Sequence, residues 1–124
     1  MEEIRKQFGD FIVAKRLEQG ISLRKMAELL EFSAPYWSDV EKNRKNPPNL
    51  EKLERIASIL HMSEEDKRQM LDLAGSDRDT VAPDIPAYIK DNDYVAAALR
   101  TARDLGANED DWEKFVADLR KRKG

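Results

Sequence analysis

The sequence contains no cysteine and only one histidine, His61. These absences exclude disulfide bonds, thiol chemistry and any metal site built from histidine and cysteine ligands. No apolar run approaches the roughly 18 residues that a membrane span requires, and the N-terminal residues MEEIRKQ lack the apolar core of a signal peptide. We therefore expect a cytoplasmic protein that uses no cofactor or metal and does not bind a membrane.

Glycine and proline are also scarce, with 5 of each among 124 residues. So few turn residues favour long helices over a β architecture, and no segment shows the pattern typical of strands. The length is that of one domain, or of one small domain with an appendage. Because the net charge is −3, the chain has no overall basic surface, and any contact with DNA would depend on local basic clusters.

Apolar residues recur at helical spacing in five segments of the N-terminal part of the chain. Ser22, Ser33 and Ser63 stand where N-caps are expected, and Gly20 and Gly75 stand where the first and fifth helices should end. The apolar positions of these predicted helices are Ile4, Phe8, Phe11, Ile12 and Leu17; Leu23, Met26, Ala27, Leu29 and Leu30; Trp37 and Val40; Leu50, Leu53, Ile56, Ala57 and Leu60; and Met70, Leu71 and Leu73. The sequence thus predicts an all-α domain of five helices.

The composition changes after this domain, which we assign to residues 1–75. The stretch SDRDTVAPDIP is polar and rich in proline, and we predict a linker over residues 76–92 with a short turn at 87–90. Two amphipathic helices joined by a turn at 106–108 follow, which predicts an αα-hairpin over residues 93–124. Its apolar stripes hold Val95, Leu99, Ala102, Leu105, Trp112, Phe115, Val116 and Leu119.

Two short predicted helices, residues 22–30 and 34–42, are joined by the turn EFS. This is the arrangement of a helix-turn-helix, in which the second helix enters the major groove of DNA. Residues 8–75 resemble the lambda-repressor-like helix-turn-helix family, also called the Cro or XRE type. The matching motifs are AKRLEQG, SLRKMAELL from Ser22, S-x-x-Y-x-S-x-V-E from Ser33 to Glu41, NRKNP, and LEKLERIASIL from Leu50. The resemblance implies a five-helix DNA-binding domain whose third helix reads the sequence.

The resemblance also implies roles for individual residues of the third helix. The residues nearest the bases should be Ala34, Pro35, Ser38 and Asp39. None of these side chains can make the bidentate base contacts of Arg, Asn or Gln, but Ala34 and Pro35 could touch thymine methyl groups. Asp39 could accept a hydrogen bond from a cytosine amino group; alternatively, it is only solvated or paired with a nearby lysine.

Contacts with the DNA backbone are expected from the residues that flank this helix. The predicted phosphate contacts are Arg24, Lys25, Tyr36, Lys42, Arg44 and Lys45. Tyr36 either binds a phosphate or is simply exposed, whereas Trp37 stands where the family has a buried aliphatic residue and is expected in the core. In the family an arginine late in the first helix pairs with the glutamate that ends the third, so Arg16 and Glu41 are expected to form a structural salt bridge.

Two positions depart from the family pattern. Leu23 stands where a glutamine usually bridges to a phosphate, which weakens the expectation of a typical docking geometry. Asn43 stands where a glycine usually adopts positive φ, and asparagine is the next best residue for that conformation.

The C-terminal hairpin has two possible roles. It either packs back on residues 50–75 of its own chain or forms a homodimer through its apolar stripes. The residues of the predicted dimer contact are Leu99, Leu105, Trp112, Phe115, Val116 and Leu119. The terminal RKRK either touches flanking DNA or is a solvated helix end.

The function predicted from the sequence is a sequence-specific regulator of transcription. Its partners would be double-stranded DNA and a second copy of the chain, acting as a dimeric repressor on an inverted repeat. Two alternatives remain, an antitoxin that holds a toxin with its C-terminal hairpin, or a protein-interaction module that has lost strong DNA binding. We do not expect an enzyme, because the sequence has no phosphate-binding glycine loop, metal cluster or nucleophile–base pair.

Overall fold

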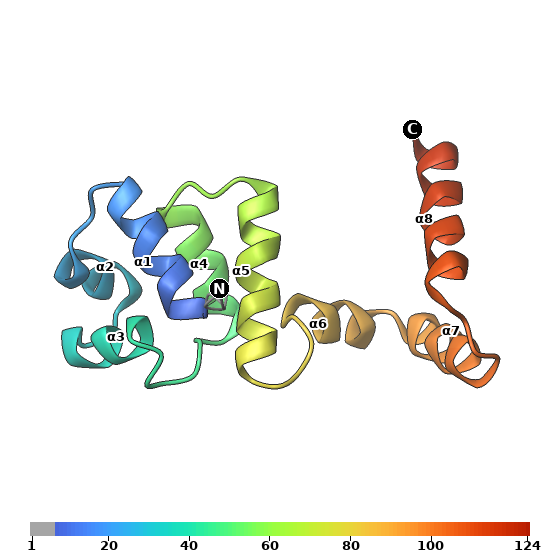
Figure 1. Ribbon diagram of the computed structural model, residues 1–124, viewed down its shortest axis with the longest axis horizontal. Helices are drawn as coiled ribbons and strands as arrows, with labels where there is room; N and C mark the ends of the chain where they lie inside the picture. Colours follow the sequence, from blue (N-terminus) through green and yellow to red (C-terminus); the bar gives the residue numbers. More distant parts are fainter. Residues whose placement is uncertain (1–6) are drawn as a thin grey trace, which may run out of the picture. The chain divides into compact units, whose positions relative to one another are not determined.

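Within residues 7–124, the part of the chain that the computed structural model describes, there are eight α-helices and no strand (Figure 1). The helices are α1 (Phe8–Glu18), α2 (Leu23–Leu30), α3 (Ala34–Glu41), α4 (Leu50–Ile59), α5 (Glu64–Asp77), α6 (Asp84–Asp91), α7 (Asp93–Asp104) and α8 (Glu109–Lys123). The predicted all-α class is therefore confirmed. Ile4, expected on the first helix, lies outside the described residues.

The chain divides between Ala87 and Tyr88 into two compact units. We call them the first domain, which ends at Ala87, and the C-terminal unit, residues 88–124. The boundary lies inside the predicted linker of residues 76–92. No helix of residues 7–124 combines the length and the apolar character that crossing a membrane requires.

Helices α2, α3 and α5 begin at the caps that the sequence predicts. Ser22, Ser33 and Ser63 each accept a hydrogen bond from the backbone N–H three residues later, at 3.0–3.2 Å. Asn49 does the same for α4, with its Oδ1 3.1 Å from the backbone nitrogen of Lys52. Each cap satisfies one of the N–H groups that a helix start leaves without a partner.

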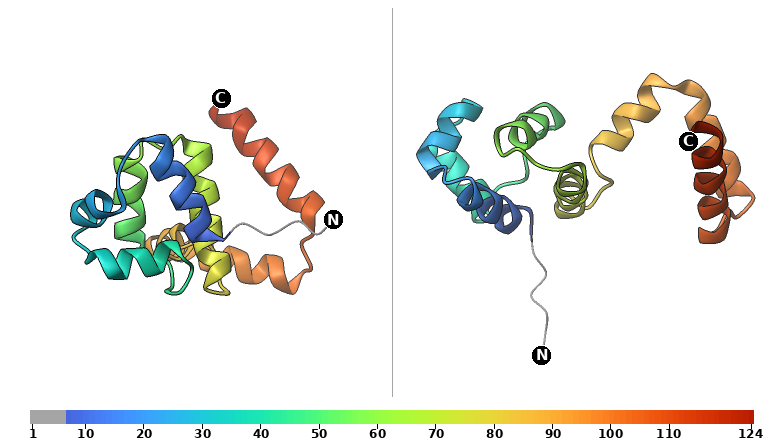
Figure 2. Two further views of the ribbon diagram at one scale, coloured as in Figure 1. Left: turned by 60° about the vertical axis from the view of Figure 1, so that its left-hand side comes forward. Right: turned by 90° about the horizontal axis from the view of Figure 1, so that it is seen from above.

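Helices α1 to α5 enclose one hydrophobic core. Helix α1 packs on α3 and α5, and α2 packs on α3 and α4. In Figures 1 and 2, α2 and α3 lie at the edge of the first domain that is farthest from α5. The buried apolar side chains are Phe8, Phe11, Ile12, Met26, Ala27, Leu30, Trp37, Val40, Leu53, Ile56, Ala57, Leu60, Met70, Leu71 and Ala74. Trp37 is fully buried at 0% exposure, so its predicted place in the core is confirmed.

Two expectations for the first domain are wrong. Leu17 is 63% exposed, because Arg16 takes the buried place that follows Phe8 and Ile12 at helical spacing. Gly75 does not end α5, which continues to Asp77. A Cβ atom on Gly75 would lie 2.5 Å from the carbonyl of Val81. The glycine is therefore needed because the chain after α5 folds back against the helix, not because the helix stops there.

Residues 84–91, expected to be linker with a short turn, instead form α6. Pro86 lies in the first turn of this helix. Backbone N–H groups of the first turn have no hydrogen-bond acceptor within the helix, so the N–H that proline lacks is not needed there. Prolines at a helix start and prolines in a loop look alike in a sequence, which explains the error.

The C-terminal unit contains α7 and α8, joined by a turn in which Gly106 adopts a φ of 72°. Asn108 caps α8 and forms a reciprocal pair of hydrogen bonds with Asp111, each at 3.0 Å. After the turn the two helices run in different directions and do not lie along one another (Figures 1 and 2). Among residues 88–124, none is buried. The two apolar stripes predicted from the sequence are thus present but not covered within this unit.

Candidate nucleic-acid interface

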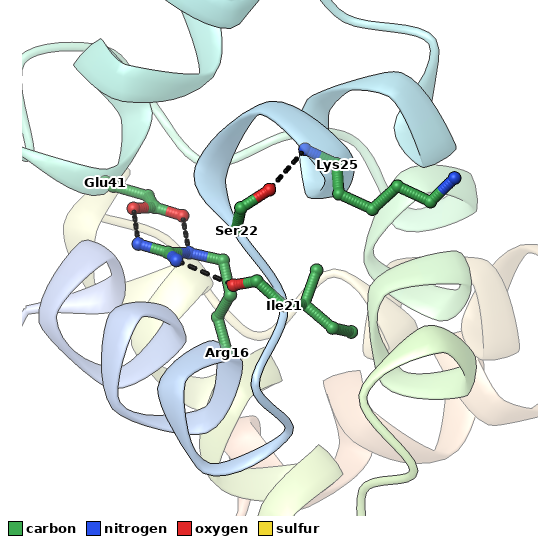
Figure 3. Close-up of polar contacts among 5 residues, drawn as sticks. All are labelled: Arg16, Ile21, Ser22, Lys25 and Glu41. Atoms are coloured by element: carbon green, nitrogen blue, oxygen red, sulfur yellow. Dashed lines mark hydrogen bonds and ion pairs between the residues drawn. The ribbon is translucent and has the colours of Figure 1, made fainter.

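A buried ion pair fixes the position of α3. The Nε and Nη2 atoms of Arg16 donate to the two carboxylate oxygens of Glu41 at 2.7 and 2.8 Å, and Nη1 donates to the carbonyl of Ile21 at 2.9 Å (Figure 3). Both charged side chains are buried, at 8% and 6% exposure. Such a charge-assisted bidentate pair has a defined geometry. One guanidinium thus ties α1 to the start of α2 and to the end of α3.

The turn between α2 and α3 is also held by packing. Glu31 adopts a φ of 62° at the end of α2. Phe32 then stacks on Trp37 with ring centroids 6.0 Å apart and meets Tyr36 edge-on at 5.0 Å. The ammonium of Lys52 lies 5.1 Å from the centre of the Phe32 ring. The turn of the helix-turn-helix is therefore fixed by aromatic packing as well as by the buried ion pair.

The four predicted base-reading residues share the outer side of α3. Trp37, Val40 and Glu41 face the core, whereas Ala34, Pro35, Ser38 and Asp39 are half-buried or exposed. The Asp39 carboxylate lies 3.9 Å from Nη1 of Arg44, and both side chains are partly exposed. The partner of Asp39 is therefore an arginine, where a lysine was one of the expected alternatives, and the ion pair is a weak one.

The predicted phosphate contacts lie on both sides of this face. Arg24 and Lys25 are exposed in the first turn of α2, and Lys42, Arg44 and Lys45 are exposed just after α3. Lys25 extends away from the Arg16–Glu41 pair (Figure 3). Its ammonium lies 3.9 Å from the Glu28 carboxylate. Such a long, exposed contact costs little to break, so it does little to hold the Lys25 ammonium in place.

Tyr36 and Leu23 differ from the other residues around α3. Tyr36 is half-buried and its ring packs against Phe32, so only part of this side chain is open to solvent. Leu23 packs against the core. The place that a glutamine usually takes in the family is therefore filled by an apolar contact that offers no hydrogen bond to a phosphate.

Asn43 adopts the predicted positive φ, at 63°. Its side chain has a second role that the sequence did not suggest. The Oδ1 atom accepts a hydrogen bond from the backbone N–H of Gly9 at 2.8 Å. A Cβ atom on Gly9 would lie 2.3 Å from the carbonyl of Glu41. The start of α1 thus lies directly against the end of α3, and the loop that carries Lys42, Arg44 and Lys45 is anchored to it. Because this contact joins residues far apart in the chain, no local pattern could have revealed it.

The residues predicted for a dimer contact all lie in the C-terminal unit. Leu99 is on α7, Leu105 follows it, and Trp112, Phe115, Val116 and Leu119 are on α8. Leu119 is half-buried and the others are exposed. No group of three or more His, Asp or Glu side chains within residues 7–124 is placed to hold a metal ion.

The match to a family model agrees with this geometry. A family model of the helix-turn-helix domain matches residues 7–71, which include α1 to α4 and part of α5. No curated protein matches the chain in sequence. A solved structure of a SinR protein/SinI protein complex is similar over 94% of this chain and 98% of the matched chain, with 22% sequence identity and a TM-score of 0.47. The family match covers more than half of the chain, so the chain belongs to the helix-turn-helix domain family.

Proposed function

We propose that the protein is a sequence-specific regulator of transcription that binds an inverted-repeat operator as a dimer and represses by blocking the promoter. The observation that carries this proposal is the outer face of α3. It is held rigidly by the buried Arg16–Glu41 pair and has exposed cations on both sides. A two-fold dimer would place two such faces in successive major grooves, about 34 Å apart. The protein acts by binding, and we propose no catalysed reaction.

The chemistry of the face determines what it can read. Ala34 and Pro35 offer apolar contacts to thymine methyl groups, and the Ser38 hydroxyl can donate or accept a hydrogen bond. Asp39 can accept from the amino group of cytosine. Without a bidentate purine reader, the specificity of one half-site is modest, so dimer spacing and DNA shape contribute the rest.

Binding would rearrange the Asp39–Arg44 pair. Their contact is 3.9 Å long and partly exposed, so breaking it costs less than about 1 kcal/mol. A nearby phosphate would attract Arg44, and Asp39 would then be free to meet a base. The Asp39 carboxylate would repel a nearby phosphate, so a phosphate could lie close to Asp39 only if Arg44 neutralises its charge.

The proposal is tested by selecting bound sequences from a random DNA library and measuring affinity by fluorescence anisotropy over a range of salt concentrations. We expect an inverted repeat to be selected. The triple variant Lys42→Ala/Arg44→Ala/Lys45→Ala should weaken binding to every sequence, and should reduce the slope of log K against log salt by about 2 to 3. Lys90→Ala/Arg100→Ala/Arg103→Ala is the matched control, because it removes three exposed cations from the other part of the chain. Failure to bind any DNA at low salt would refute the proposal.

Asp39→Asn tests the base-reading role separately. If Asp39 meets a cytosine, the variant should change the preference at one position of each half-site by about 1–3 kcal/mol and leave the salt slope unchanged. An unchanged selected sequence would exclude Asp39 as a base-reading residue while leaving the rest of the proposal intact.

A second candidate is a module that binds another protein, such as an antitoxin that holds a toxin. The observation that favours it is the exposed apolar side chains of α8, Trp112, Phe115 and Val116. The two functions differ in what the α8 side chains bind and in whether DNA is needed. A tight protein partner recovered together with no affinity for DNA would support this second candidate.

A further inference from the structure

Helix α8 carries an exposed apolar stripe. Trp112, Phe115, Val116 and Leu119 are spaced to lie on one side of the helix, and the first three are 41%, 51% and 42% exposed. The rings of Trp112 and Phe115 are already packed edge-to-face, with centroids 6.0 Å apart. Hollows of about 380 and 440 Å³ lie beside the stripe, one against Trp112 and Val116 and the other against Phe115 and Leu119. A ridge with a groove on each side is the surface that another helix packs on.

The charges of α8 are divided between its two ends. The first turn holds Glu109, Asp110 and Asp111, and the last turn holds four consecutive basic residues, 120–123. Within residues 88–124, none of these four basic side chains has an ion-pair partner; the ion pair on α8 joins Lys114 to Asp110 at 3.2 Å. The helix thus presents an acidic end and a basic end beside one continuous apolar stripe.

The stripe is symmetric about a point between Phe115 and Val116. Reversing the helix about that point places Trp112 on Leu119 and exchanges Phe115 with Val116, so the apolar pattern matches itself. It also exchanges the acidic end for the basic end. A second copy of α8 laid antiparallel on the first therefore matches it in both apolar shape and charge. A parallel copy would place basic end beside basic end.

The flanks of the stripe support the same arrangement. Helical spacing puts Glu113 and Arg120 on one flank, and Asp111 and Arg122 on the other. A two-fold axis perpendicular to an antiparallel pair brings the same flank of both copies together, so each acid meets a base of the other copy. We propose that the protein dimerises through antiparallel pairing of α8 with α8 of a second copy, with the two-fold axis between Phe115 and Val116. This inference deepens the proposed function, and rests on it, because it names the surface that would join two DNA-binding domains.

The choice of a second copy over a different protein rests on this self-complementarity. A foreign partner would need a stripe and charges that match α8, whereas a second copy already has them. A two-fold contact uses the same patch on both copies. Trp112 and Phe115 are the largest exposed side chains of the stripe, so they would supply most of the contact.

The test uses the full chain and measures its mass by sedimentation over a range of protein concentrations. We expect the native chain to dimerise. Arg120→Glu/Arg122→Glu leaves only acidic side chains on both flanks of the stripe, and should raise the dissociation constant at least about tenfold because the reversed charges recur on both copies. Lys114→Glu/Lys121→Glu is the matched control, with the same change of charge on the opposite side of the helix, and should dimerise as the native chain does. Circular dichroism verifies that each variant keeps its helices.

A complementary variant tests the pairing directly. Asp111→Arg/Glu113→Arg leaves only basic side chains on both flanks of the stripe, and alone it should also dimerise at least about tenfold more weakly than the native chain. An equimolar mixture of it with Arg120→Glu/Arg122→Glu should restore the dimer, because an acidic helix then faces a basic one. A native chain that stays monomeric would overturn the inference, as would Arg120→Glu/Arg122→Glu dimerising as tightly as the native chain.

DNA binding measured on the same samples separates this inference from the proposed function. A monomer that binds DNA specifically would refute α8 pairing and leave the function standing. A dimer that is lost in Arg120→Glu/Arg122→Glu but binds no DNA would support α8 pairing and refute the function.

Discussion

The first domain and the C-terminal unit are both built from amphipathic helices, but only the first domain encloses its apolar side chains. Fifteen apolar side chains are buried among residues 7–87 of the first domain, whereas none is buried among residues 88–124. Five helices can surround a common centre, but the two helices α7 and α8 diverge and cannot (Figure 1). An apolar stripe thus predicts a helix, and the number and placement of its neighbours determine whether it is covered.

The two tryptophans show this contrast most directly. Trp37 packs on Phe32 and Trp112 packs on Phe115, with ring centroids 6.0 Å apart in both pairs. Yet Trp37 is 0% exposed and Trp112 is 41% exposed. The local aromatic pair is similar in the two places, so the difference in burial comes from the surrounding helices. Stability should therefore depend on Trp37, and association should depend on Trp112.

The largest predicted effect is that of Trp37→Ala. Removing this fully buried side chain should lower the free energy of unfolding by about 3–5 kcal/mol, because a large cavity remains among α1 to α5. Trp112→Ala should change the unfolding of the first domain by less than about 0.5 kcal/mol. Urea unfolding followed by far-ultraviolet circular dichroism measures both values, at a protein concentration low enough to keep the chain monomeric. Equal losses of unfolding free energy for the two variants would show that the first domain does not depend more on Trp37 than on Trp112.

Trp37→Phe serves as the control for the cavity. It keeps an aromatic ring but removes the indole N–H, which is buried and has no hydrogen-bond partner within the described part of the chain. The loss of side-chain volume should lower the free energy of unfolding, whereas the removal of an unsatisfied buried donor should raise it. We therefore expect a cost well below that of Trp37→Ala.

Breaking an ion pair should also cost much more unfolding free energy in the first domain than in the C-terminal unit. Glu41→Ala leaves the buried guanidinium of Arg16 without its carboxylate, which should cost about 3–5 kcal/mol of unfolding free energy. Arg103→Ala in α7 removes an ion pair to Asp104 at 3.0 Å that is largely exposed. It should cost less than about 1 kcal/mol. Thermal unfolding of the two variants measures this difference.

The double variant Arg16→Met/Glu41→Leu tests why the buried pair matters. Replacing both charges by apolar side chains removes the unpaired charge, so most of the stability lost in Glu41→Ala should return. DNA affinity should remain below that of the native chain, because the hydrogen bond from Arg16 to the Ile21 carbonyl is also lost. A double variant as unstable as Glu41→Ala would indicate that geometry, and not unpaired charge, causes the loss.

Much of the first domain could be predicted from the sequence, because its signals are local. Serine caps and apolar spacing act within a few residues, and they located the starts of α2, α3 and α5. The contact between Asn43 and Gly9 could not be predicted in this way, since it joins residues 34 positions apart. The exposure of Leu17 was missed for a related reason. The buried position next to it is filled by a charged residue, Arg16, whose partner Glu41 is distant in the chain.

The candidate site was predictable to a different degree. The motif resemblance named Arg16 and Glu41, and the structure joins them. The same resemblance could not indicate that Arg44 lies near Asp39, because that contact depends on how the loop after α3 turns. In the C-terminal unit the periodicity predicted the stripes of α7 and α8, but a pattern within one helix contains no information about what covers it.

Two glycines should have smaller effects with different causes. Gly75→Ala places a Cβ 2.5 Å from the Val81 carbonyl in the first domain, and the displaced backbone should cost about 1–3 kcal/mol. Gly106→Ala meets nothing within 4 Å, but its φ is +72°, so we expect a cost of about 1 kcal/mol from backbone strain. Hydrogen exchange should locate the first loss around α5 and the second in the turn between α7 and α8. Loss of protection in the opposite regions would contradict both assignments.

The smallest predicted effect concerns the ion pair between Lys15 on α1 and Asp66 on α5. The ammonium lies 3.1 Å from the carboxylate. The hydrogen bond to Asp66 raises the pKa of Lys15 above the ordinary value of 10.5. The partial loss of solvation lowers this pKa by less, and the negative charges of Asp66 and Glu18 raise it further. The stabilisation is therefore complete below pH 10.5 and is lost as the pH rises through the higher folded-state pKa. Because the side chains of Lys15 and Asp66 both remain partly exposed, solvent screens their interaction, and Lys15→Gln should cost only about 0.5 kcal/mol at neutral pH.

Lys114→Gln in α8 is the matched control for this pair. The ammonium of Lys114 lies 3.2 Å from the Asp110 carboxylate, a distance similar to that of the Lys15–Asp66 pair. The side chains of Lys114 and Asp110, however, are both mostly exposed and belong to one helix. Unfolding of the first domain should therefore not respond to Lys114→Gln at any pH. The difference in unfolding free energy between the native chain and Lys15→Gln should shrink as the pH is raised above 10.5, since the Lys15 ammonium of the native chain then loses its proton. A difference that persists at high pH would mean that the packing of the Lys15 stem, whose ammonium lies 5.6 Å from the centre of the Phe11 ring, contributes more than its charge.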